Sequence, residues 1–123
     1  MARPDQLYHF CCSHSRRDIG SFGLLVPLVC HPEFGFKIVW LTTEAHPDRE
    51  RTGLTSHTGL RCDRMQYRYV VTDLSNCRAW IGSIERATIR PERLEQFEGA
   101  GDPEHWWIAS QPVRARLDRD YVP

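Results

Sequence analysis

The sequence predicts a small α+β domain, and three observations lead to this class. The chain has 123 residues, a length that suits one compact domain, so residues 1–123 are expected to fold as a single unit. Many short segments are rich in β-branched and aromatic residues, whereas only two segments carry helical signals. Strand and helix segments do not alternate regularly, which argues against a doubly wound parallel sheet.

The strand predictions rest on apolar, β-branched and aromatic runs bounded by turn residues. The clearest is 37–42 (KIVWLT), which follows Gly35. In 24–30 (LLVPLVC), Pro27 interrupts the apolar run, so we expect a short edge strand or a buried crossing segment. The remaining strands are predicted at 6–12, 66–72, 78–84, 106–110 and 113–117.

Two short helices and one long loop complete the predicted elements. Residues 13–20 start with a serine and end at Gly20, as a short helix does. Residues 91–98 have a proline in the first turn and Glu92 near the positive end of the helix, and Gly99 follows as a stop. The segment 43–64 is polar and contains proline and glycine, so it is predicted as a loop that is either functional or mobile.

Composition excludes some classes of function. The 16 basic and 16 acidic side chains cancel, which argues against a strongly basic nucleic-acid module. All but one of the basic residues are arginine, whose guanidinium pairs phosphate or carboxylate bidentately; codon usage in a GC-rich genome is the alternative explanation. The chain has no apolar run near the ~20 residues of a membrane helix, and its start lacks the apolar core of a signal peptide. We therefore expect a cytoplasmic protein without membrane contact.

The five cysteines are expected to be reduced and mostly buried, because an odd count without a secretory signal argues against a disulfide framework. A structural zinc is a less favoured alternative, since the spacing lacks two clean ligand pairs. A second alternative is a reactive Cys12, which lies directly before the predicted helix at 13–20. No residue is therefore predicted as a metal ligand. The side chains considered for zinc were His9, Cys11, Cys12, His14, Cys30 and His31.

The opening of the chain carries a recognisable pattern. Leu7-Tyr8-His9-Phe10, a short helix and then Gly23-Leu24-Leu25-Val26-Pro27 resemble the first unit of small ADP-ribosyltransferase-like domains. The chain is also similar, over nearly its whole length, to a group of short uncharacterised bacterial and phage proteins. The resemblance implies a compact split β-sheet of short strands with two or more short helices and a cleft that binds NAD.

The resemblance also implies roles for individual residues. His9 matches the histidine that hydrogen-bonds a ribose hydroxyl of NAD. Trp40 stands where the family has a tyrosine that stacks on nicotinamide. Glu104 matches the acidic residue that holds the nicotinamide-ribose hydroxyl, so Glu104 and His9 form the predicted catalytic pair. The predicted cofactor-binding residues are His9, Trp40, Thr42, Arg16 and Arg17, with the two arginines placed on the pyrophosphate.

The function implied is NAD-dependent ADP-ribosyl transfer, with NAD as a substrate and a protein, a nucleic acid or water as the acceptor. Breaking the nicotinamide–ribose bond passes through an oxocarbenium-like state, which a nearby carboxylate stabilises. The alternative is a non-catalytic binding protein on the same scaffold, such as an accessory factor of a phage or mobile element. In that alternative, the protein has the same fold but no catalytic activity.

Overall fold

The computed structural model describes residues 4–11, 19, 23–29, 35–47, 65–99 and 101–123. These residues form short antiparallel strands, two α-helices and one 3-10 helix, so the predicted α+β class is confirmed. The strands are β1 (Tyr8–Cys11), β2 (Leu24–Leu25), β3 (Leu28–Val29), β4 (Lys37–Thr42), β5 (Tyr67–Val71), β6 (Arg78–Ala79), β7 (Trp106–Ala109) and β8 (Val113–Leu117). The helices are α2 (Ile84–Ala87), α3 (Pro91–Glu98) and the 3-10 helix η2 (Pro103–His105).

The described strands are hydrogen-bonded in one continuous order, β2-β8-β5-β1-β4-β7-β6, and β3 also pairs with β4. Because β2 and β3 lie on the same short segment, this segment joins β8 to β4 and closes a ring with β5 and β1, and β7 and β6 continue the sheet beyond β4. Val26 and Pro27 lie between β2 and β3, where the segment leaves β8 and reaches β4.

A first hydrophobic core fills the inner face of this ring. Alternation along β4 sends Val39 and Leu41 into it, and the neighbouring strands contribute residues with the same period of two. Ile19 packs against its edge. The buried members of this first core are Leu7, Cys11, Leu25, Val39, Leu41, Tyr69, Val71, Cys77, Trp107, Ala109, Val113 and Ala115.

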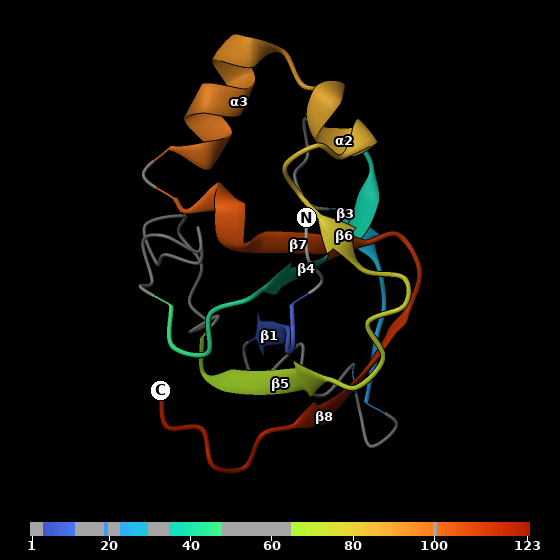
Figure 1. Ribbon diagram of the computed structural model, residues 1–123, viewed down its shortest axis with the longest axis vertical. Helices are drawn as coiled ribbons and strands as arrows, with labels where there is room; N and C mark the ends of the chain where they lie inside the picture. The colour runs from blue at the N-terminus through green and yellow to red at the C-terminus, as the bar shows by residue number, and fades with distance from the viewer. Residues whose placement is uncertain (1–3, 12–18, 20–22, 30–34, 48–64, 100) are drawn as a thin grey trace.

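A second core lies on the other face of β4 and β7, under the two α-helices. Trp80 is completely buried there, beside Ile38 and Ile108. Leu94 and Phe97 of α3 pack onto it. Figure 1 shows α2 and α3 together at one end of the molecule, with β5 and β8 at the opposite end. The two strands β4 and β7 are thus shared by both cores.

Most of the predicted elements are confirmed. The strands at 37–42 and 113–117 and the helix at 91–98 have the predicted limits. The predicted strand at 78–84 is wrong beyond Ala79, because Ser83 instead caps helix α2 by accepting a hydrogen bond from the Arg86 amide. The predicted helix at 13–20, apart from Ile19, and residues 48–64 of the predicted loop lie outside the described residues. In the part of the chain that is described, no helix has the length and apolar character needed to cross a membrane.

Candidate functional site

Polar side chains gather where β4 ends and β7 begins. Thr42 pairs with Trp106 across these antiparallel strands, and the Thr43 amide donates to the His105 carbonyl at 3.0 Å. The residues that follow β4 therefore meet those that precede β7. We call this region the β4–β7 corner, and it consists of residues 42–44 and 102–105.

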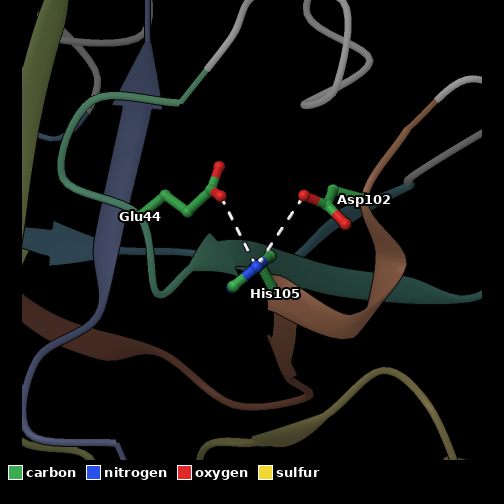
Figure 2. Close-up of side chains that lie close together, drawn as sticks. All are labelled: Glu44, Asp102 and His105. Carbon is green, nitrogen blue, oxygen red and sulfur yellow. Dashed lines mark ion pairs between the residues drawn. The ribbon is translucent and has the colours of Figure 1, made fainter.

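His105 is at the centre of the corner. Its Nδ1 is 2.8 Å from the Thr43 hydroxyl oxygen. Its Nε2 is 3.5 Å from a Glu44 carboxylate oxygen and 3.7 Å from an Asp102 carboxylate oxygen. Figure 2 shows the two carboxylates reaching toward the imidazole from different segments. The side chains of His105, Glu44 and Asp102 are 39%, 26% and 17% exposed, so the cluster is open to solvent on one side.

Local structure explains how these groups converge. Pro103 opens the 3-10 helix η2, and the His105 amide donates to the Asp102 carbonyl at 2.9 Å. This turn places Asp102 and His105, three residues apart, on the same side of the chain. After β4, the Glu44 amide donates to the hydroxyl of buried Thr42 at 3.2 Å, which turns the chain so that Glu44 faces His105.

Glu104, the predicted catalytic carboxylate, lies in η2 between these residues and is exposed. A hydrogen bond with the Asp102 side chain raises the pKa of Glu104 above its ordinary value, and the negative charge of Asp102 adds to this effect. The corner therefore holds three neighbouring carboxyl groups and one imidazole. Of the predicted site residues, Thr42 and Glu104 are both found here.

His9, the other predicted catalytic residue, lies on β1 and is engaged within the fold. Its Nδ1 is 2.8 Å from the backbone carbonyl oxygen of Trp40. Because a carbonyl only accepts, Nδ1 carries the proton that is donated. Burial lowers the pKa of His9, although the hydrogen bond to Trp40 partly opposes this shift. Burial thus favours the neutral form of His9.

Trp40 and His9 are brought together by the backbone, but their side chains diverge. The Trp40 ring packs against Trp80 and Trp106, with ring centroids 4.8 and 5.7 Å away, as part of the second core. Tyr8 pairs with Thr42, so alternation along β1 and β4 places the side chains of His9 and Trp40 on opposite faces. The described residues thus do not assemble His9, Trp40 and Glu104 around one cleft.

The remaining predicted residues have different outcomes. Arg16 and Arg17 lie outside the described residues, as do Cys12, His14, Cys30 and His31 of the alternative zinc set. Cys11 is buried in the first core.

Sequence reasoning missed Glu44, Asp102 and His105 as a group. The available signal was their position, since Glu44 follows one predicted strand closely and Asp102 and His105 directly precede another. What the pattern lacked was the pairing of β4 with β7, which are more than 60 residues apart in the chain. No protein-family model, no curated protein and no solved structure matches this chain.

Proposed function

We propose that this protein cleaves the nicotinamide–ribose bond of NAD and transfers ADP-ribose to a macromolecule or to water, in the cytoplasm. The observation that carries the proposal is the set of carboxyl groups at the β4–β7 corner, which includes Glu104. The resemblance of residues 7–27 to ADP-ribosyltransferase-like domains supports the same activity and a related fold. In this proposal, Arg16 and Arg17 pair with the pyrophosphate.

The proposed reaction needs negative charge beside the ribose. The C–N bond breaks heterolytically, nicotinamide leaves with the bonding electron pair, and the ribose carbon becomes oxocarbenium-like. An ionised carboxylate at the corner stabilises this developing positive charge. A nucleophile of the acceptor, or water, then attacks the ribose carbon and loses its proton. Glu104 is the proposed catalytic carboxylate, because it is exposed and therefore accessible to a bound substrate.

The proposal gives His9 and Trp40 positioning roles. Direct contact of both side chains with nicotinamide and its ribose requires them on one face, and strand pairing places them on opposite faces. The bond between His9 Nδ1 and the Trp40 carbonyl instead joins β1 to β4 just before the corner. His9 and Trp40 then hold the strand that carries Thr42 and Glu44.

The test is release of nicotinamide, measured chromatographically after incubation with NAD and with protein, RNA or DNA acceptors. We expect Glu104→Gln to lower the rate at least 100-fold while the circular dichroism spectrum and unfolding midpoint stay unchanged. Glu92→Gln, an exposed carboxylate of α3, is the matched control and should keep the full rate. Absence of nicotinamide with every acceptor, together with no measurable NAD binding, would overturn the proposal.

A non-catalytic binding protein on the same scaffold is the second candidate. The observation that favours it is the engagement of His9 and Trp40 within the fold, which leaves the predicted His–aromatic–Glu set unassembled. This candidate predicts tight calorimetric binding to a host macromolecule, no nicotinamide release, and no effect of His9→Ala or Glu104→Gln on that binding. Nicotinamide release that depends on Glu104 would exclude it.

A further inference from the structure

We propose that Glu44, Asp102 and His105 form a binding site for a divalent first-row transition-metal ion, represented by Mn²⁺. One ligand atom from each residue lies within 4.8 Å of the other two. The inference rests on this geometry alone and does not depend on the proposed NAD chemistry.

The spacing of the ligand atoms fits a shared ion better than direct hydrogen bonds. The distances from His105 Nε2 to the Glu44 and Asp102 oxygens are 3.5 and 3.7 Å. Charge-assisted N–H···O hydrogen bonds are shorter, at ~2.7–2.9 Å. Two ligands that each lie ~2.1 Å from one ion are separated by these distances when the angle at the ion is about 110–125°. The two distances from His105 Nε2 are therefore compatible with one ion bound between the imidazole and the two carboxylates.

The orientation of the imidazole supports the same inference. Thr43 Oγ1 is within hydrogen-bond distance of His105 Nδ1, at 2.8 Å. With the proton on Nδ1, the Nε2 lone pair faces the two carboxylates, as Figure 2 shows for the ring position. Metal-bound histidines are commonly held in this way, with the second ring nitrogen donating to a protein oxygen. Thr43 is thus a positioning residue for the ligand His105.

The backbone holds the ligands in place before any ion binds. Glu44 follows β4, and Asp102 and His105 precede β7, the strand that pairs with β4 over four residue pairs. The Thr43 amide fastens the two segments by donating to the His105 carbonyl at 3.0 Å. Ligands held next to two paired strands need little reorganisation on binding, which favours affinity.

The ligand set also indicates the kind of ion. One imidazole and two carboxylates suit Mn²⁺, Fe²⁺ or Zn²⁺, whereas thiolate-rich sites favour softer ions. Three protein ligands leave further coordination positions, and the 39% exposure of His105 keeps this side open. Water or an oxygen atom of a bound anion, such as a phosphate group, can occupy those positions.

The experiment is a titration of the chelator-treated protein with MnCl₂ at pH 7.5, followed by the electron paramagnetic resonance signal of free Mn²⁺. Mn²⁺ is used because it competes poorly for the cysteine thiols elsewhere in the chain. We expect one ion per chain. His105→Ala and Asp102→Asn should each weaken binding at least tenfold, and Thr43→Val should weaken it less. Glu92→Gln, on the exposed surface of α3, is the matched control and should bind as the wild type does.

Two outcomes would overturn the inference. One is no saturable binding up to 1 mM MnCl₂, which lies at the weak end of measurable affinities (about −4 kcal/mol). The other is unchanged affinity in His105→Ala, which would place the ion elsewhere. Neither outcome affects the test of NAD cleavage, because that test measures the release of nicotinamide and not the binding of Mn²⁺. Conversely, if no nicotinamide is released, the Mn²⁺ titration still tests the metal site.

Discussion

At the scale of single residues, Glu98 links the helices to the second core. Its carboxylate accepts from the indole N–H of Trp80 at 2.6 Å and from Arg86 at 2.9 and 3.1 Å. The Glu98 side chain is only 14% exposed, and Trp80 is completely buried. A buried indole N–H without an acceptor destabilises the folded state, because its hydrogen bond to water is lost and not replaced. Glu98 thus fixes the end of α3 against the second core.

We predict that Glu98→Ala lowers the free energy of unfolding by about 2–3 kcal/mol, because it leaves the Trp80 donor unpaired in the core. Glu98→Gln keeps an acceptor oxygen and should cost about 1 kcal/mol, since only the charge is lost. Urea denaturation measures both. Glu95→Ala, an exposed residue of the same helix, is the control and should change stability little. Equal effects of Glu98→Ala and Glu95→Ala would contradict this role.

His9 makes stability depend on pH, and the sign follows from its environment. Burial lowers the pKa of His9 in the folded protein. Unfolded His9 takes up a proton near its ordinary value of ~6.5. Below that pH the unfolded state binds more protons, so stability falls as the pH decreases, until the lower pKa of the folded state is reached.

We predict that the wild type loses more stability between pH 7.5 and pH 5.5 than His9→Asn does, by about 1 kcal/mol. The asparagine amide still donates to the Trp40 carbonyl but does not titrate. Urea unfolding of both proteins at the two pH values provides the comparison, and the double difference removes the contribution of other groups. The same pH dependence in both proteins would show that His9 is not the group responsible.

At the scale of elements, the junction before β2 depends on one glycine. Gly23 has a φ of +60°, and an added Cβ would lie 2.0 Å from the carbonyl oxygen of Ala115. The Ala115 amide donates to the Gly23 carbonyl at 2.7 Å, so β8 cannot move away without losing this bond. Gly35, before β4, has a φ of +75° but no atom within 4 Å of an added Cβ. Both glycines have a positive φ, but only at Gly23 would an added Cβ clash with a neighbouring strand.

We therefore predict very different costs for the same substitution. Gly35→Ala should lower the free energy of unfolding by about 1 kcal/mol, the cost of a left-handed conformation for alanine. Gly23→Ala should cost more than about 3 kcal/mol, because β2 must also separate from β8. Urea denaturation or, for a poorly folded variant, the near-ultraviolet circular dichroism spectrum reports the loss. Similar stability of the two variants would contradict the close approach at Gly23.

Elements with strong local signals were predictable from the sequence, and those defined by long-range contacts were not. The β-branched run of β4 and the Pro91-to-Gly99 signals of α3 are local, and both elements formed as predicted. Helix α2 has only four residues, too few to show a period, so it was missed. The site shows the same limit. Glu104 was predicted just before β7, but Glu44 reaches His105 through strand pairing, which no local pattern encodes.

At the scale of the whole molecule, the two cores share β4 and β7. Val39 and Leu41 of β4 face the first core, and Ile38 faces the second. Both cores lose packing contacts if these two strands separate. The cores should therefore unfold together, although they lie on opposite faces of the sheet.

This architecture predicts a single unfolding transition. Of the four tryptophans, Trp40, Trp80 and Trp106 pack in the second core, so fluorescence reports mainly on that side, whereas far-ultraviolet circular dichroism reports on all strands and helices. Both signals should give the same urea midpoint. Leu25→Ala in the first core and Ile38→Ala in the second should each cost about 2–5 kcal/mol and shift both signals equally. If Ile38→Ala moved the fluorescence transition alone, the helices and second core would form a separate unit, and the β4–β7 corner would lie at a boundary between two independently folding parts.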